Sequence, residues 1–198
     1  YLWSDGQTTS TASNLTAGTY NVTITDQKGC FKDTSVTVLE PALVSVDTAF
    51  QDSVSCNGLF DGSASILGAG GNGIYSYLWS DGQTTSTASN LTAGTYNVTI
   101  TDQKGCFKDT SVIVLEPDAL LIASMSMDSA SCNGVADGTA TANGITGGNG
   151  INSFSWNTTP VQTTNPATGL AAGNYTVTVT DQKGCFTTRD TTVLEPDA

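Results

Sequence analysis

The sequence contains no histidine, and it has only six lysine or arginine residues against 18 aspartate or glutamate residues, for a formal net charge of −12. So few cations cannot neutralise a phosphate backbone, which excludes a nucleic-acid partner and disfavours an anionic membrane surface. The absence of histidine removes the most common acid–base catalyst, and no serine lies in a Gly-x-Ser-x-Gly motif. We therefore expect that the chain is not an enzyme.

Long apolar segments are also missing. No stretch approaches the ~20 apolar residues that cross a bilayer, so we expect no membrane insertion. The abundant residues are instead Gly, Ser, Thr, Asn and Asp. Such a composition favours short strands joined by many turns and opposes helix.

Internal repetition organises the whole chain. Residues 1–40 recur at 77–116 with one change, Thr37 to Ile113. A third, more diverged copy follows, in which Trp156 lies 77 residues after Trp79 and Cys185 lies 79 residues after Cys106. Each copy ends in Leu-Glu-Pro, and proline stops a strand because it cannot donate to a sheet ladder. We therefore expect half a module at 1–41, a complete module at 42–117 and a complete, diverged module at 118–198.

Within the middle module, short segments of alternating polarity predict about seven strands, which favours a Greek-key β-sandwich of the immunoglobulin-like (PKD-like) type. The clearest strand is 95–102, and the residues before it, Leu91 to Tyr96, resemble the tyrosine corner of that fold. The residues expected in the cores are Trp3, Trp79, Trp156, Tyr20, Tyr96 and Tyr175.

The five cysteines fit the repeat frame, with one in Ser-Cys-Asn-Gly and one in Lys-Gly-Cys in each complete module. This predicts the disulfides Cys56–Cys106 and Cys132–Cys185, which would help each module to fold alone, and leaves Cys30 with a partner upstream of Tyr1. A competing pairing bridges neighbouring modules through Cys30–Cys56 and Cys106–Cys132. Either pairing indicates an oxidising compartment.

The combination of motifs resembles a known family. Ser55–Gly62, Gly70–Gly73, Tyr77–Gly82 and Leu91–Cys106 are similar to the SprB-type repeats of gliding-motility adhesins in the Bacteroidota. The resemblance implies a very long adhesin that a type IX secretion system exports to the cell surface, where it is associated with the outer membrane and carried by the gliding machinery. It implies extracellular surfaces or glycans and neighbouring repeats as partners.

Recurring carboxylates raise the hypothesis of calcium at the module boundaries, since calcium prefers oxygen ligands. The alternative is that Asp-Gly and Asp-x-x-Gly are simply good turn formers. Calcium is the only cofactor that the sequence suggests. Its candidate ligands are Asp61, Asp137, Asp102, Asp181, Glu116 and Asp118.

Two kinds of sugar interaction remain open. Short Asp-Thr or Asp-Ser motifs resemble the O-glycosylation motif of secreted Bacteroidota proteins, with Thr48, Ser53, Ser129 and Thr191 as acceptors. The aromatic residues Tyr75, Tyr77 and Trp79 alternate along one strand, either as a sugar-stacking platform or as part of the core.

The sequence therefore predicts a structural or adhesive stalk segment of a secreted cell-surface protein. One alternative is a carbohydrate-binding accessory module of a secreted protein. Another is a self-assembling surface filament in which neighbouring chains complete one another's sheets.

Overall fold

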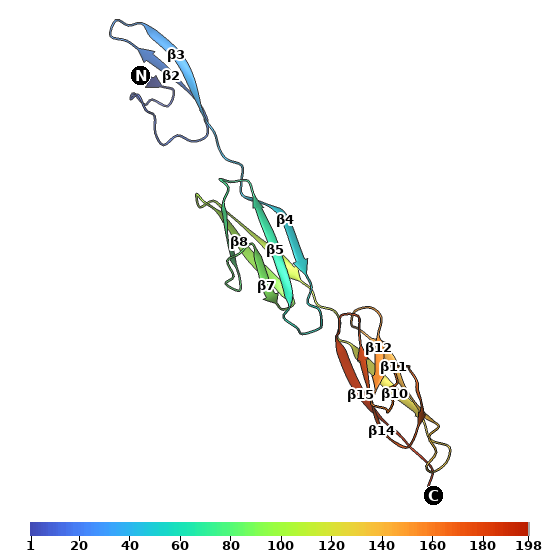
Figure 1. Ribbon diagram of the computed structural model, residues 1–198. Helices are drawn as coiled ribbons and strands as arrows, with labels where there is room; N and C mark the ends of the chain where they lie inside the picture. Colours follow the sequence, from blue (N-terminus) through green and yellow to red (C-terminus); the bar gives the residue numbers. More distant parts are fainter. Residues whose placement is uncertain (198) are drawn as a thin grey trace.

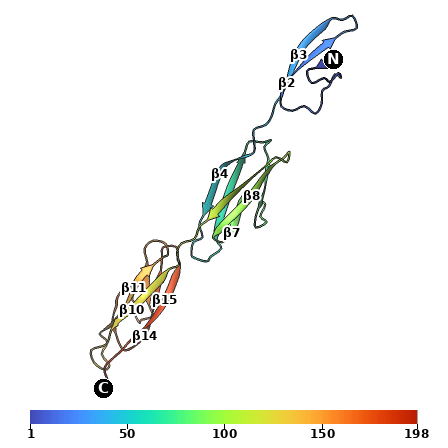
Figure 2. The ribbon, with the colours of Figure 1, turned by 180° about the vertical axis from the view of Figure 1, so that it is seen from behind.

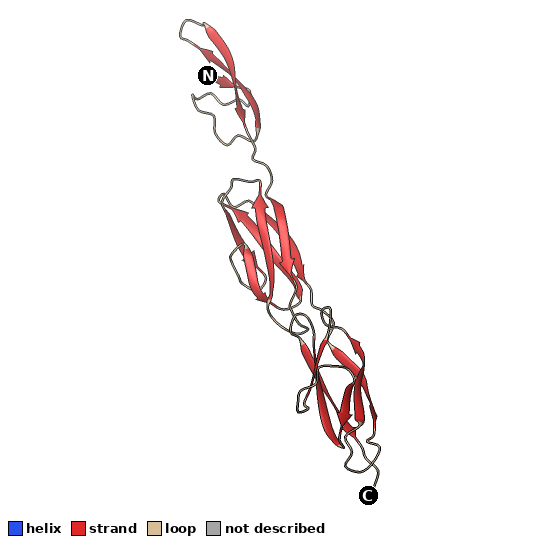
Figure 3. Cartoon of the chain, turned by 45° about the vertical axis from the view of Figure 1, so that its right-hand side comes forward, coloured by secondary structure: helices blue, strands red, loops and turns tan. Residues whose placement is uncertain are grey.

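The computed structural model describes residues 1–197. All of the regular secondary structure within these residues is β-strand. The strands form three bodies that follow one another along an elongated molecule, with the termini at opposite ends (Figure 1, Figure 2). In each body the strands run roughly along the rod and the loops gather at its ends (Figure 3). The expected all-β class is confirmed.

In the middle module, strands form where apolar and polar residues alternate, because a strand places successive side chains on opposite faces. Val98 and Ile100 are buried in the core, whereas Asn97, which points to the opposite face, is exposed. The strands are β4 (Ser45–Asp52), β5 (Gly62–Ala69), β6 (Tyr75–Trp79), β7 (Thr87–Leu91), β8 (Gly94–Asp102) and β9 (Phe107–Val114).

The third module repeats this order of strands despite its diverged sequence. Its strands are β10 (Leu121–Asp128), β11 (Gly138–Thr146), β12 (Ser153–Trp156), β13 (Ala167–Leu170), β14 (Gly173–Thr180) and β15 (Phe186–Val193). Pro117 lies in the segment between β9 and β10, outside any strand.

Each complete module contains two three-stranded antiparallel sheets. The sheets of the middle module have the strand orders β4-β5-β7 and β6-β8-β9, and those of the third module β10-β11-β13 and β12-β14-β15. In the middle module, β6 pairs with β8 so that Trp79 lies opposite Val98, and the β8–β9 hairpin pairs Gly94 with Val114. The chain crosses between the sheets as it does in immunoglobulin-like sandwiches. The expected tandem immunoglobulin-like architecture is confirmed, with six strands in each complete module rather than seven.

A tryptophan lies at the centre of each complete module. Trp79 is 2% exposed and Trp156 is 1% exposed, among small and β-branched residues of both sheets. Their indole N–H groups donate to the carbonyl oxygens of Thr85 and Thr164 at 2.8 and 2.9 Å, so burial leaves no unpaired donor.

A tyrosine corner precedes the long central strand in all three bodies. The hydroxyl of Tyr96 donates to the carbonyl oxygen of Thr92 at 3.1 Å, and Tyr20 and Tyr175 make the equivalent bond four residues upstream. Tyr96 and Tyr175 are partly buried and pack against the two cores. This bond fixes the turn that leads into the strand, as in other immunoglobulin-like folds.

Residues 1–41 form one sheet rather than two. Its strands β1 (Leu2–Trp3), β2 (Gly18–Thr25) and β3 (Phe31–Val38) have the order β1-β2-β3, and no second sheet covers them within the described residues. Trp3 and Tyr20, both expected in a core, are therefore only partly buried.

Candidate functional site: a disulfide-bonded junction between modules

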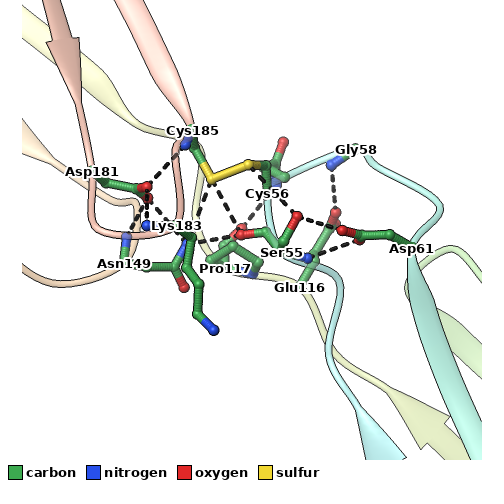
Figure 4. The surroundings of a disulfide bond; sticks show 11 residues. Ser55, Cys56, Gly58, Asp61, Glu116, Pro117, Asn149, Asp181, Lys183 and Cys185 are labelled. Atoms are coloured by element: carbon green, nitrogen blue, oxygen red, sulfur yellow. Dashed lines mark hydrogen bonds between the residues drawn. A yellow bond between two sulfur atoms is a disulfide. The ribbon is translucent and has the colours of Figure 1, made fainter.

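The middle and third modules are joined by a disulfide bond in addition to the polypeptide. Cys56 and Cys185 form it, with an S–S distance of 2.06 Å and a Cα–Cα distance of 5.5 Å, across a sequence separation of 129 residues (Figure 4). Cys56 lies in the loop between β4 and β5, and Cys185 lies in the loop between β14 and β15. We call these the plug loop, residues 53–61, and the receptor hairpin, residues 181–185.

Both pairings expected from the sequence are wrong. Cys30, Cys106 and Cys132 are free and exposed, and Cys56 bonds to neither Cys106 nor Cys30. The physical reason is strand direction. The chain enters each complete module at one end and leaves it at the other, so its first and last strands run the same way. The loop after the first strand and the loop before the last strand consequently lie at opposite ends.

The repeat frame could have revealed this geometry. A Ser-Cys-Asn-Gly cysteine follows the first strand of its module, and a Lys-Gly-Cys cysteine precedes the last strand. Because the first and last strands run in the same direction, the Ser-Cys-Asn-Gly cysteine lies at the exit of its module. The Lys-Gly-Cys cysteine lies at the entrance. The nearest partner for each lies in the adjacent module, and Cys56–Cys185 is such a pair.

The plug loop is held in shape by its own module. The backbone N–H of Val54 donates to the carbonyl oxygen of Leu115 at 3.0 Å, and that of Gly58 donates to the Glu116 carboxylate at 3.0 Å. The hydroxyl and backbone N–H of Ser55 both donate to Asp61, and these bonds lower the pKa of the Asp61 carboxyl. These contacts fix the loop at the end of the module from which the chain leaves.

The receptor hairpin is built around a buried carboxylate, Asp181. One oxygen of Asp181 accepts the N–H groups of Lys183 and Cys185 at 2.8 and 2.9 Å. The other accepts the backbone N–H and side-chain amide of Asn149, at 2.7 and 3.1 Å. Burial alone raises the pKa of Asp181, but these four hydrogen bonds outweigh it and the net pKa is lowered.

Asn149 also binds across the junction. Its side-chain nitrogen lies 2.9 Å from the carbonyl oxygen of Ser55, to which it donates, and 3.7 Å from the sulfur of Cys185. The sulfur of Cys185 is itself 3.2 Å from the same carbonyl oxygen. A single asparagine therefore ties the receptor hairpin of one module to the plug loop of the other (Figure 4).

The six calcium candidates have hydrogen-bonding roles instead or lie apart. Asp61, Glu116 and Asp181 accept the loop bonds described above, and Asp102 and Asp137 repeat the roles of Asp181 and Asp61. Across residues 1–197, no three His, Cys, Asp or Glu side chains gather in a group that could hold a metal ion. Hydrogen bonds within loops and turns account for Asp61, Asp102, Asp137 and Asp181, as the alternative interpretation expects. Calcium at the module boundaries stays a prediction.

The predicted O-glycosylation acceptors differ in accessibility. Ser53 and Ser129 are exposed, and Thr191 is partly exposed. The hydroxyl oxygen of Thr48 is buried and has no hydrogen-bond partner, so it is inaccessible in the folded module. Glycosylation at the other three positions remains a prediction.

The aromatic residues of β6 pack as part of the core. Trp79 is buried, and the partly buried Tyr75 and Tyr77 pack against the core of the middle module. The hydroxyl of Tyr75 donates to the carbonyl oxygen of Gly70 at 2.6 Å. The core reading, which was the alternative, describes this stripe.

These features define a class: immunoglobulin-like repeats in tandem, with two successive modules joined by a disulfide. The family model described as SprB repeat matches residues 48–84, which include β5, β6 and part of β4. The middle module therefore carries an SprB repeat, and the resemblance seen in its motifs is confirmed. The match at residues 48–84 supports a surface adhesin-like repeat in this module.

Solved structures with a related architecture share little sequence with the chain. Three N-terminal domains of the highly immunogenic outer capsid protein (Hoc) of bacteriophage RB49 match with 20% identity and a TM-score of 0.44, over 78% of this chain and 59% of that one. The N-terminal eight Ig domains of Down syndrome cell adhesion molecule match with 14% identity and a TM-score of 0.39, over 89% and 26%. Domains 7, 8 and 9 of the S-layer protein SbsC match with 13% identity and a TM-score of 0.27, over 90% and 69%. We draw no functional conclusion from them.

Among curated proteins, no sequence matches this chain. Within residues 1–197, no helix is long and apolar enough to cross a membrane.

Proposed function

We propose that the chain is a load-bearing, non-catalytic stalk segment of a large secreted surface adhesin. The observation that carries this proposal is the disulfide between Cys56 and Cys185, which connects two successive modules covalently. A stalk that transmits force must resist extension at its junctions, where otherwise only a short linker connects the modules.

The position of the bond supports a mechanical role. Force applied along the chain passes from β4 through the two sulfur atoms into β15, because the bond lies after the first strand of one module and before the last strand of the next. The strands from β5 to β14 lie outside this path. They can therefore lose contacts under load without any lengthening of the stalk.

The resemblance to SprB-type repeats supports the finer parts of the proposal. They are export by a type IX secretion system, attachment at the outer membrane and participation in adhesion and gliding. A net charge of −12 favours an extended, soluble stalk, since like charges repel one another along it.

Single-molecule stretching of the chain between its two ends tests the mechanical role. The chain between the two cysteines, whose sequence separation is 129, spans at most roughly 430–460 Å when extended. We expect the stalk not to gain this length under force until a reductant is added. The matched control is Cys56→Ser, in which the same length should be released without reductant. Equal extension of the wild-type and variant chains under oxidising conditions would reject the load-bearing role.

A cellular experiment tests the adhesive role separately. In the organism that makes the protein, deletion of the repeats should reduce attachment to surfaces and gliding speed, whereas the purified chain should bind no sugar on a glycan array. Strong binding to one glycan would instead favour a carbohydrate-binding module.

A further inference from the structure

The middle module has a second receptor hairpin, residues 102–106, at its entrance. One oxygen of Asp102 accepts the N–H groups of Lys104 and Cys106 at 2.8 and 3.0 Å. The other accepts the backbone N–H and side-chain amide of Asn72 at 2.8 and 2.9 Å. These are the same four bonds that organise the hairpin around Cys185, so the receptor geometry forms without a bridge to the adjacent module.

The surroundings of the two receptor cysteines also match. A pocket beside Cys185 is lined by Leu120, Phe186 and three plug-loop residues, which include Leu59. A pocket beside Cys106 is lined by Leu43, Val44 and Phe107, together with the boundary residues Glu40 and Pro41. Val44 and Phe107 are the counterparts of Leu120 and Phe186 in the repeat. The pocket at Cys106 is therefore lined by apolar side chains at the same positions.

The third module has the complementary part, a second plug loop around Cys132. The N–H of Ser131 donates to Asp137 at 2.8 Å, and the N–H of Gly134 donates to Glu195 at 2.7 Å. The backbone N–H of Val135 donates to the carbonyl oxygen of Cys132 at 3.1 Å, as that of Leu59 does to Cys56. Each complete module therefore has a receptor cysteine at its entrance and a plug cysteine at its exit.

We infer that the pocket at Cys106 is a docking site for the Ser-Cys-Asn-Gly plug loop of another SprB-type module, which bonds to Cys106 as Cys56 bonds to Cys185. The amide of Asn72 then donates to the carbonyl oxygen of the incoming serine, as Asn149 donates to Ser55. The disulfide at the junction of the middle and third modules is one instance of a head-to-tail connection that each complete module can make at both ends.

Cys30 provides an internal control because its hairpin has the same sequence but different surroundings. Residues 25–32 are identical to 101–108, and both cysteines are exposed. Asp26 accepts the N–H groups of Lys28 and Cys30, but no asparagine among residues 1–197 donates to it. The two cysteines therefore share their local chemistry and differ in the pocket.

The bond forms by oxidation of two thiols. Each thiol loses one proton and one electron. A small-molecule disulfide such as oxidised glutathione takes up the two protons and two electrons and is reduced to two thiols. Exchange proceeds through a mixed disulfide, so a redox buffer of reduced and oxidised glutathione lets the product reach equilibrium.

The test uses the full chain with Cys132→Ser and a synthetic peptide of residues 53–62. The peptide contains both Ser55 and Asp61, the partners of the two hydrogen bonds that lie within the loop, and it lacks Leu115 and Glu116, which accept the other two. After equilibration in glutathione buffer, cleavage at Glu40, Glu116 and Glu195 separates Cys30 from Cys106. Tandem mass spectrometry then measures the peptide on Cys30 and on Cys106, and distinguishes Cys106 from Cys56, which lies in the same fragment. We expect about tenfold more peptide on Cys106 than on Cys30, equivalent to roughly 1.4 kcal/mol.

Two variants separate docking from simple thiol reactivity. Asn72→Ala should lower the ratio of Cys106 to Cys30 labelling, with Cys30 labelling unchanged. A peptide with Leu59→Ser should lower the same ratio, because Leu59 lines the pocket at the existing junction. Equal labelling of Cys30 and Cys106 by the unmodified peptide would overturn the inference, as would a ratio that neither variant changes.

Discussion

Residues 1–40 and residues 77–116 have nearly the same sequence but different degrees of burial. Trp3 is partly buried in the first segment, whereas Trp79 is 2% exposed in the second. Val36 is 49% exposed, whereas its counterpart Val112 is 4% exposed. The strands β6, β8 and β9 of the second segment pack against the sheet β4-β5-β7, to which the segment itself contributes β7, and no such sheet covers the first segment within the described residues.

The local hydrogen bonds do not differ in this way. The indole of Trp3 donates to the carbonyl oxygen of Thr9 at 2.9 Å, as Trp79 does to Thr85. The tyrosine corner and the turn at the Lys-Gly-Cys hairpin are also present in both segments. Local sequence therefore sets turns and hairpins, and the opposite sheet supplies most of the burial that stabilises a module.

The largest effect should come from removal of the core tryptophan. Trp79→Ala removes a buried side chain and leaves a cavity, so we expect a loss of about 3–5 kcal/mol in the stability of the middle module. Hydrogen exchange of the β8–β9 amides measures it without the tryptophan as a probe. Trp3→Ala should cause a clearly smaller loss in β2–β3. If both changes cost the same, the comparison based on burial is wrong.

A smaller effect should follow from Asp102→Ala and should depend on pH. Burial alone raises the pKa of Asp102, but hydrogen bonds from Asn72, Lys104 and Cys106 outweigh it and hold the pKa at about 2. The unfolded value is ~3.9, so the stabilisation is complete above about pH 4 and is lost as the pH falls through about 2. The midpoints of urea unfolding of wild type and variant should therefore differ at pH 7 and converge near pH 2.

Asp26→Ala is the matched control for this change. Within the described part of the chain, the Asp26 carboxylate accepts hydrogen bonds only from its own hairpin, so Asp26→Ala should leave the unfolding of the middle module unchanged at every pH. A difference between wild type and Asp102→Ala that is constant from pH 7 to pH 2 would show that the charge of Asp102 does not stabilise the module.

The smallest effect should come from the one position at which the two segments differ. Ile113 is 54% exposed and lies opposite Thr95 on the β8–β9 hairpin. Ile113→Thr recreates the pair formed by Thr19 and Thr37, whose hydroxyl oxygens are 3.2 Å apart. We expect a change in stability within about 0.5 kcal/mol, measured by thermal unfolding. A much larger loss would mean that Ile113 contributes to the core.

The sequence predicts more of the fold than of the disulfide-bonded junction. Alternating polarity located the strand over 95–102, and the observed strand β8 spans Gly94–Asp102. The first strand of the middle module, β4, spans Ser45–Asp52 and continues into polar residues at its end, where Gln51 and Asp52 pair with β5. The carboxylates were recognised as recurrent, but the donors that each accepts come from distant residues such as Asn72 and Asn149.

By itself, the sequence determined the repeat, the strands, the tyrosine corners and the hairpins, because these depend on side-chain alternation and on hydrogen bonds between residues close in the chain. Only the tertiary structure decided which cysteines meet. Cys56 and Cys185 are 129 residues apart, and they come together because two modules lie end to end with the exit of one against the entrance of the next. Burial of the tryptophans was likewise decided by the second sheet. The sequences around Trp3 and Trp79 are identical, but a second sheet covers only Trp79 within the described residues.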